Sequence, residues 1–313
     1  MMNKALSYIQ ILGPTATGKT DLAIALAQNI PSEIISVDSV MVYTGFDIGS
    51  AKPNLEERQG IIHHLIDIGR PDALTFDGYQ FCEQATLLIE DIHKRNKVPI
   101  LTGGTMLYAH LLNHIYHQGM PPKDHELRSL LHERAKTEGI ECLYHELITV
   151  KPTAKSEIMP NDAVRIIRNL EIEYSTQKQQ QKPVHQLDPY LIHIHVDQRS
   201  EHISHMSKRF DQMIGSGFID ELEELRLLYQ KIPHHPVFKS IGYHEGMQYL
   251  SGLINKESFV ERSKIATRQY AKKQMTWLRS WKTKPHQSLQ WSPHSPFEVE
   301  TLTNKIKTEM SKH

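Results

Sequence analysis

The sequence feature that most constrains the fold is the octapeptide at residues 13–20, which reads GPTATGKT. It matches the phosphate-binding loop pattern G-x-x-x-x-G-K-[ST], in which backbone N–H groups and a lysine cradle phosphate oxygens. An apolar run, Tyr8 to Leu12, precedes the loop, and a segment rich in Ala and Leu, Asp21 to Asn29, follows it. The pattern requires a strand before the loop and a helix after it. The sequence therefore predicts an α/β fold with a parallel sheet flanked by helices and a phosphate site at the carboxyl edge of the sheet.

Each position of this loop has a chemical role in the pattern. Gly13 and Gly18 permit the tight turn and the close approach of N–H groups to phosphate oxygens. Lys19 supplies a mobile positive charge, and the Thr20 hydroxyl can ligate Mg²⁺. The other positions that would line the anion site are Pro14, Thr15, Ala16 and Thr17. The alternative is a glycine-rich turn that binds nothing, and the agreement of both flanking elements with the pattern disfavours it.

Two further apolar runs extend the predicted sheet, and both end in groups of chemical interest. The run Glu33 to Val37 is followed by Asp38 and Ser39. A carboxylate at the carboxyl edge, beside a phosphate loop, can bind Mg²⁺ or accept a proton. Its alternative role is to cap the next turn. The run Val98 to Leu101 ends in TGGT, where ordinary phosphate-loop NTPases place a magnesium-binding Asp. We therefore expect the loop to hold a phosphorylated substrate that is not hydrolysed as a nucleotide.

Composition limits the partners of the chain. The 313 residues carry 36 Lys and Arg against 36 Asp and Glu, so the net charge is zero and any site for a polyanion must be local. The N-terminus shows no cleavable signal, and no apolar run approaches the ~18 residues of a membrane span. We expect a cytoplasmic protein without a membrane partner. Cys82 and Cys142 lie far apart and fit neither a disulfide framework nor a zinc site.

The chain is predicted to contain a helical insertion. After Pro122 the composition shifts to short charged helices, of which the last, Asp162 to Tyr174, has Asp162 as its expected cap. A polar link, STQKQQQKPVHQ, precedes the point where a strand pattern resumes at Leu191. We predict a phosphate-loop core over residues 1–122 and 189–313, with an insertion at residues 123–188 that closes over the site as a lid.

The C-terminal part of the core is predicted to be helical and basic. Between residues 239 and 284, ten Lys and Arg stand against three Glu, a local excess of seven positive charges. On a helix over residues 256–281, four of them fall within about 80° of one another and form a stripe suited to a phosphate backbone. These four are Lys264, Arg268, Lys272 and Arg279. Trp277 and Trp281 could pack beneath the stripe or stack on bases. The alternative is a solvated charged face with core tryptophans.

Together these motifs resemble the tRNA dimethylallyltransferases, also called tRNA isopentenyltransferases. The matching stretches are GPTATGKT, SVDSVMVYTGFDIGSAKP, HHLID, PILTGGTMLY and ATRQYAKKQMTWLRSW, which occur in family order. The resemblance implies transfer of a dimethylallyl group from dimethylallyl diphosphate to the exocyclic amino nitrogen of the adenosine 3′-adjacent to the anticodon in tRNA, with Mg²⁺. It implies the tRNA anticodon stem-loop and dimethylallyl diphosphate as partners, and we expect a monomer.

The resemblance also implies roles for individual residues. The catalytic group would be Lys19, Asp38, Thr105 and Arg128, with Asp38 as the base and Arg128 in an Asp-x-x-x-Arg element that begins at Asp124. The loop at residues 13–20 would hold the diphosphate, with Thr20 as the metal ligand. The residues expected to contact tRNA are Asp38, Ser39, Val40, Met41, Val164, Arg165, Ile166, Ile167, Arg168, Lys239, Gly242, Tyr243, His244, Lys272, Lys273, Gln274, Trp277 and Arg279.

The chain departs from the family pattern at three of these positions. Val164 stands where the family has Gln, and Lys239 and His244 stand where it has Arg. Lys keeps the charge without the bidentate fork, and His is mostly neutral at pH 7, so we expect weaker phosphate contacts there.

Three rival functions stay open. They are a phosphate-loop kinase, an RNA-binding nucleotide switch without chemistry, and an enzyme that prenylates free AMP. The missing Asp after the third strand and the basic helix count against the kinase. Asp38 counts against the switch, and the basic helix and the insertion count against AMP as the acceptor.

Overall fold

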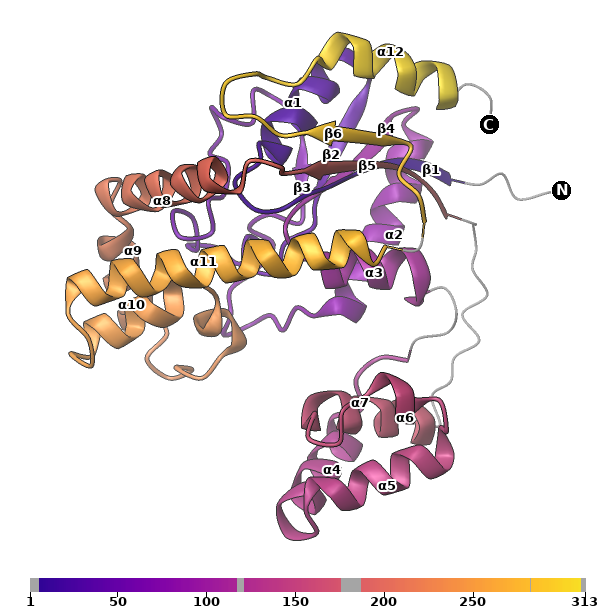
Figure 1. The fold of residues 1–313 in the computed structure, drawn as a ribbon, viewed down its shortest axis with the longest axis vertical. Coiled ribbons are helices and arrows are strands. Elements are labelled where there is room, and N and C mark those ends of the chain that lie inside the picture. Colours follow the sequence, from indigo (N-terminus) through magenta and orange to yellow (C-terminus); the bar gives the residue numbers. More distant parts are fainter. Residues whose placement is uncertain (1–5, 117–120, 176–186, 282, 311–313) are drawn as a thin grey trace, which may run out of the picture. The chain divides into compact units, whose positions relative to one another are not determined.

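The computed structural model describes residues 6–116, 121–175, 187–281 and 283–310. The chain forms two compact units, which are coloured along the sequence in Figure 1. One, here called the core, comprises Met1–His110 and His185–His313, and the other, here called the lobe, is Leu111–Val184. The lobe thus begins at Leu111, whereas the predicted insertion begins at residue 123.

The core is built on one parallel sheet of six strands in the order β3-β2-β4-β1-β5-β6. The strands are β1 (Leu6–Leu12), β2 (Ser32–Ser36), β3 (His63–His64), β4 (Val98–Thr102), β5 (Leu187–His195) and β6 (Gln287–Gln290). In register, Ile11 of β1 pairs with Thr102 of β4 and with Ile192 of β5. The loop after β1 therefore lies in the middle of the carboxyl edge, between two neighbouring strand ends. This arrangement confirms the predicted α/β class.

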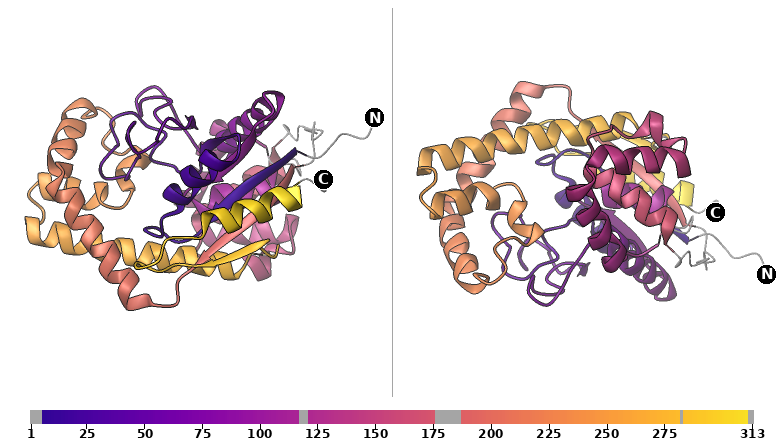
Figure 2. Two further views of the ribbon diagram at one scale, coloured as in Figure 1. Left: turned by 90° about the horizontal axis from the view of Figure 1, so that it is seen from above. Right: turned by 90° about the horizontal axis from the view of Figure 1, so that it is seen from below.

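Helices complete the core. They are α1 (Lys19–Asn29), α2 (Gly78–Lys94), α3 (Met106–His114, of which residues 111–114 belong to the lobe), α8 (Arg199–Gly215), α9 (Phe218–Leu228), the 3₁₀ turn η2 (Pro236–Lys239), α10 (Tyr243–Leu250), α11 (Lys256–Arg279) and α12 (Val299–Met310). Helices α8 to α11 pack on one another beyond the carboxyl ends of the strands, and we call them the arm (Figure 1). Helix α12 packs along α1 (Figure 2), where Leu302 and Ile306 join the apolar cluster of Leu22 and Leu26.

The lobe has an apolar core of its own. Its helices are α4 (His125–Thr137), α5 (Ile140–Val150), α6 (Ala154–Glu157) and α7 (Ala163–Tyr174). Buried Leu131, Leu143 and Leu147 pack with Leu170, so each long helix contributes an apolar face. The predicted cap is confirmed, because the Asp162 side chain accepts a hydrogen bond from the backbone N–H three residues later.

Among the described helices, none combines the length and the apolar character needed to cross a membrane.

Candidate active site

The phosphate loop lies between β1 and α1 with the backbone geometry that its pattern requires. Gly18 has a φ of 70°, and Ala16 also lies in the left-handed region with a φ of 59°. A Cβ atom on Gly13 would lie 2.9 Å from the Ile194 Cβ atom of β5, so only glycine fits this close approach. The Thr17 hydroxyl donates to the Pro14 carbonyl at 2.8 Å and closes the loop on itself. Helix α1 begins at the end of this loop, so its N-terminal N–H groups add partial positive charge to the site.

Lys19 is buried in this loop. The residue is only 8% exposed, and its Nζ atom donates to the Pro14 carbonyl at 2.5 Å. Burial, with a smaller contribution from the nearby Arg209 guanidinium, lowers the pKa of Lys19 to about 7, and Asp38 opposes the shift. A bound phosphate would supply countercharge and favour the protonated lysine. The lysine is therefore placed to interact with an anion in the loop.

Arg209 of α8 is a second cation at the loop to which the sequence alone assigned no role. Burial lowers the pKa of its guanidinium, and the carboxylates of Asp21 and Glu57 oppose this shift. Helix α8 follows β5 directly, so a basic residue on it comes to the carboxyl edge of the sheet. The position of α8 directly after β5 is the signal in the sequence that could indicate a basic residue near the loop. Which residue of the helix faces the loop depends on packing.

Asp38 follows β2 and combines two roles that the sequence left as alternatives. Its Oδ1 atom accepts from the N–H groups of Val40 at 2.8 Å and Met41 at 3.2 Å, so it caps the turn. Within the described part of the chain, its Oδ2 atom has no hydrogen-bond donor. Burial raises the pKa of Asp38, and the two backbone hydrogen bonds, Lys19 and Lys52 oppose the rise. One oxygen is thus fixed and the other can accept a proton.

The TGGT stretch after β4 packs directly against the loop that follows β2. A Cβ atom on Gly103 would lie 2.2 Å from the Val37 carbonyl oxygen, so glycine is required there. The Thr105 backbone N–H donates to the same carbonyl at 3.0 Å. The Thr105 hydroxyl oxygen accepts from the Ser39 N–H at 3.2 Å. The structure therefore brings Asp38, Ser39 and Thr105, all of them predicted site residues, to one place.

Helix α11 connects this stretch to the phosphate loop through Gln274. Its Oε1 atom accepts from the Thr15 N–H at 2.7 Å, and its Nε2 atom donates to the Gly104 carbonyl at 2.8 Å. The Tyr270 hydroxyl donates to the same carbonyl at 2.6 Å. Gln274 is only 1% exposed. The family resemblance implies that this residue contacts tRNA, whereas both ends of its side chain bind the protein. We therefore give it a positioning role instead.

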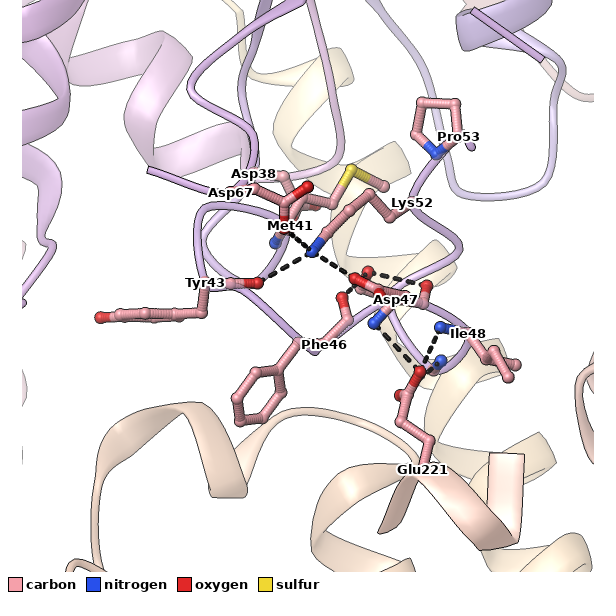
Figure 3. Close-up of polar contacts among 12 residues, drawn as sticks. Asp38, Met41, Tyr43, Phe46, Asp47, Ile48, Lys52, Pro53, Asp67 and Glu221 are labelled. Carbon is pink, nitrogen blue, oxygen red and sulfur yellow. Dashed lines mark hydrogen bonds and ion pairs between the residues drawn. The ribbon is translucent and has the colours of Figure 1, made fainter. Parts of the chain in front are cut away.

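The loop after Asp38 is held by a buried lysine (Figure 3). The Lys52 side chain is 3% exposed, and its Nζ atom donates to the Tyr43 carbonyl at 2.8 Å and to the carboxylates of Asp47 and Asp67, each at 2.5 Å. Three acceptors around one ammonium group fix the course of the loop between residues 43 and 67. No role was assigned to Lys52 from the sequence, because its partners are known only from the fold.

A carboxylate on the arm holds the same loop from the other side (Figure 3). Glu221 of α9 accepts from the N–H groups of Asp47 at 3.1 Å, Ile48 at 2.6 Å and Gly49 at 3.2 Å. It also accepts from the Tyr243 hydroxyl at 2.7 Å. Tyr243 is fully buried, so the expected tRNA contact of its side chain is corrected to a structural role.

The other residues expected to contact tRNA divide by exposure. Exposed side chains are those of Val164, Arg165, Lys239, His244, Lys272, Lys273 and Arg279. Ile166 and Ile167 belong to the apolar core of the lobe, so the prediction that they contact tRNA is corrected. Gly242 is the N-cap of α10, where its φ of 84° favours glycine.

The predicted basic stripe on α11 is partly neutralised. Lys264 Nζ lies 2.6 Å from the Asp211 carboxylate, and Arg268 Nη2 lies 3.2 Å from that of Glu261. This leaves Lys272 and Arg279 as the exposed cations of the four. The four cations therefore differ in their surroundings, and their contact with phosphates stays a prediction.

The two tryptophans of α11 pack against histidine rings within the core. The ring centroid of Trp277 lies 5.2 Å from that of His110, and Trp281 lies 5.9 Å from His110 and 6.2 Å from His193. These contacts agree with the alternative in which the tryptophans are packing residues.

Lys239 and His244 line an open cavity of about 570 Å³ on the arm, together with Phe238, Met247 and Gln248. Two of the three positions where the chain departs from the family pattern therefore face the same cavity.

The predicted basic residues of the lobe are bound to a carboxylate. Arg128 of α4 and Arg168 of α7 both donate to Glu171. The sequence alone indicates no role for this glutamate. Glu171 lies on the same helix as Arg168, three residues later.

The described residues contain no group of three or more His, Cys, Asp or Glu side chains able to hold a metal ion. This does not conflict with Mg²⁺, which commonly keeps several waters and binds through one or two protein ligands plus substrate phosphates. Thr20, partly exposed in the first turn of α1, fits such a shared site.

Comparison with known proteins identifies the family. The family model described as IPP transferase matches residues 41–281. The chain belongs to the IPP transferase family. This IPP transferase is 41% identical over 290 residues to a tRNA dimethylallyltransferase of Coxiella burnetii, covering 90% of this chain and 92% of the relative. It is 40% identical over 280 residues to a tRNA dimethylallyltransferase of Neisseria meningitidis, covering 86% and 88% of the two chains.

Solved structures give the same result. A tRNA isopentenylpyrophosphate transferase from Bacillus halodurans superposes on this IPP transferase with a TM-score of 0.69 and 32% identity, covering 98% of this chain and 99% of the other. A eukaryotic dimethylallyltransferase, described as acting on tRNA, superposes with a TM-score of 0.70 and 27% identity, covering 87% and 69%. Both the sequence and the fold therefore confirm the resemblance.

Proposed function

We propose that this IPP transferase is a tRNA dimethylallyltransferase. It transfers the dimethylallyl group of dimethylallyl diphosphate to the exocyclic amino nitrogen of the adenosine 3′-adjacent to the anticodon in tRNA. The observation that carries the proposal is a phosphate loop beside a half-buried carboxylate, Asp38, whose Oδ2 atom has no donor within the described chain. The 41% identity to a tRNA dimethylallyltransferase supports the identity of the substrates.

Asp38 acts as the general base in this mechanism. An adenine amino group is a poor nucleophile because its lone pair is delocalised into the ring, so its proton must leave as the new bond forms. The amino nitrogen bonds to C1 of the allyl group, the bond from C1 to the diphosphate oxygen breaks, and the diphosphate leaves with that electron pair. The proton passes to Oδ2 of Asp38. Burial raises the pKa of this carboxyl and makes it a stronger base.

The loop at residues 13–20 holds the diphosphate. Its N–H groups, together with Lys19 and Arg209, stabilise the negative charge that grows on the leaving group. Thr105, held beside Ser39, belongs to the catalytic group of the core. Arg128 is a further catalytic residue by the resemblance to the family. Thr20 would hold Mg²⁺ jointly with the diphosphate, and the ion would supply further neutralisation of charge when bound.

The exposed basic residues of the arm bind tRNA. Lys272, Lys273 and Arg279 contact phosphates, which position the RNA without reading its sequence. The cavity of Lys239 and His244 accepts part of the anticodon loop. The target adenosine unstacks to reach the segment from Asp38 to Met41, which costs little in a single-stranded loop. For the insertion predicted at residues 123–188, we propose the role of shielding the allyl group from water.

The test is incubation of the full chain with labelled dimethylallyl diphosphate and, separately, with total tRNA, AMP or ATP. We expect label in tRNA alone. Label in AMP would indicate an adenylate isopentenyltransferase, and phosphate transfer from ATP without prenylation would indicate a kinase. We place the enzyme in the cytoplasm with its tRNA substrate, as a monomer without a membrane partner, and size-exclusion chromatography checks the monomer.

A further inference from the structure

Glu171 is a fully buried carboxylate within the lobe, and it has two arginine partners. It accepts from Arg128 Nε at 3.0 Å and Nη2 at 2.5 Å, and from Arg168 Nη1 at 2.8 Å. The backbone N–H of Asp124 donates to it at 2.8 Å. One carboxylate thus accepts hydrogen bonds from two guanidinium groups and one backbone N–H, all within the lobe.

The cluster fixes the start of α4. The Asp124 side chain caps this helix by accepting from the Leu127 N–H at 3.0 Å, and Arg168 Nη2 donates to the Pro121 carbonyl at 2.7 Å. Residues 121 to 128 are thus tied to α7 through Glu171. Arg128 is locked at two of its three nitrogens, while its side chain stays 25% exposed. Its Nη1 atom has no hydrogen-bond partner within the described chain.

A second arginine of the same lobe shows what a purely structural pair looks like. Arg134 of α4 uses all three guanidinium nitrogens on two carboxylates, those of Glu138 and Glu146. No nitrogen of Arg134 is left without a partner. Arg128 differs, because its Nη1 atom has no hydrogen-bond partner within the described chain.

We propose that Glu171 is a positioning residue that holds the Arg128 guanidinium ready to bind a phosphate group of a substrate. This rests on the proposed function, in which both substrates carry phosphates. A guanidinium fixed in advance loses less side-chain entropy when it binds, and its planar fork keeps the required direction. Stability alone is a weak explanation, because replacing a buried ion pair with apolar residues is often neutral or stabilising.

The test compares Glu171→Gln, Arg128→Ala and the double variant, with Glu146→Gln as the matched control, in steady-state prenyl transfer to tRNA. We expect Glu171→Gln to lower kcat/KM at least ~10-fold, since a small misplacement of a positioning group has effects of this order or larger. The double variant should be no worse than Arg128→Ala alone, because Glu171 acts through that arginine. Glu146→Gln should keep kcat/KM within about twofold of wild type, because Glu146 binds Arg134 rather than Arg128. A rise in the KM for dimethylallyl diphosphate identifies its diphosphate as the ligand, and a rise in the KM for tRNA identifies an RNA phosphate.

Direct binding of inorganic diphosphate and of tRNA to the full-length variants provides a second readout, with thermal unfolding measured for each. Glu171→Gln removes a negative charge, so bulk electrostatics would strengthen anion binding, whereas loss of positioning weakens it. Wild-type kinetics in Glu171→Gln, a loss that adds to that of Arg128→Ala, or tighter binding of both anions would overturn the proposal. If the wild-type chain transfers no dimethylallyl group, the proposed function fails and the binding experiment still decides the role of Glu171.

Discussion

Replacing Gln274 with Leu should damage the phosphate loop without touching an exposed surface. The substitution keeps the size of the side chain but leaves the Thr15 N–H, now 2.7 Å from Oε1, without an acceptor. A buried donor left unpaired costs about 1–3 kcal/mol. The substitution also removes the hydrogen bond from Gln274 to the Gly104 carbonyl. That loss adds little, because the carbonyl keeps its hydrogen bond from Tyr270 at 2.6 Å. We expect the free energy of unfolding to fall by about 2 kcal/mol, and turnover to fall at least ~10-fold because the loop is misplaced.

The measurements are urea unfolding and steady-state prenyl transfer, with tRNA binding followed separately. Gln269→Leu is the matched control, because Gln269 is an exposed glutamine on the same helix. It should leave all three quantities close to wild type. A Gln274→Leu variant with wild-type stability and wild-type KM for dimethylallyl diphosphate, but weaker tRNA binding, would refute the positioning role. That result would return Gln274 to the tRNA contact that the family resemblance implied.

Three further predictions concern groups at the site and on α11. Lys19→Ala should lower turnover about 10²-fold or more, measured with purified enzyme at saturating substrates, because it removes charge that stabilises the departing diphosphate. Asp38→Asn should still bind tRNA, while the rate of prenyl transfer falls at least ~10²-fold. Burial raises the pKa of Asp38, so the rate of the wild-type enzyme should decline as the pH falls through a pKa above the ordinary value of an Asp carboxyl. Lys272→Ala should reduce the slope of log affinity for tRNA against log salt concentration, in magnitude, by roughly 0.7–0.9. Lys264→Ala removes a cation already paired with Asp211 and should change this slope much less. Equal changes in the two variants would contradict the division between paired and exposed cations.

Much of the core could be predicted from local patterns. The phosphate loop, the strands on either side of it in the sheet and most helices follow from short apolar runs and helical periodicity, which depend on neighbours in sequence. The cap at Asp162 was predictable for the same reason, because its partner lies three residues away. What the sequence could not provide is the identity of distant partners. The hydrogen bond from Thr15 to Gln274 joins positions 259 residues apart, and nothing local to either residue indicates it.

The errors at Ile166 and Ile167 have a different cause. The family motif implies that five consecutive residues, 164–168, all contact tRNA. On a helix, successive residues turn by about 100°, so five of them cover the whole circumference and cannot face one ligand. The structure exposes Val164 and Arg165 and buries the two isoleucines in the lobe core. The sequence already contained this information in its apolar periodicity, and the periodicity was the better guide to individual side chains.

The carboxylates that organise the site were missed for a physical reason. Glu171 and Glu221 lie on the inward faces of their helices, four residues after the buried Ile167 and three after the buried Phe218. A glutamate on such a face is rarely buried unless it is paired, and most of the partners here lie far away in the sequence. Only the fold shows that one accepts from two arginines and the other from three consecutive N–H groups of the loop after Asp38. Burying such a charge is costly unless every lone pair finds a donor, so each fixes the groups around it.

The phosphate loop shows how far tertiary contacts refine a motif. The pattern alone treats every backbone N–H of the loop as a phosphate donor, but in this chain the Thr15 N–H is bound to Gln274 and the Thr15 carbonyl accepts from His202 at 2.9 Å. His202 lies on α8 and Gln274 on α11, so two helices of the arm set the conformation of this residue. The donors for the diphosphate must then come from the later part of the loop and the first turn of α1. Because α11 also carries the exposed Lys272 and Arg279, the helix that we propose to bind tRNA is also the helix whose Gln274 binds the phosphate loop.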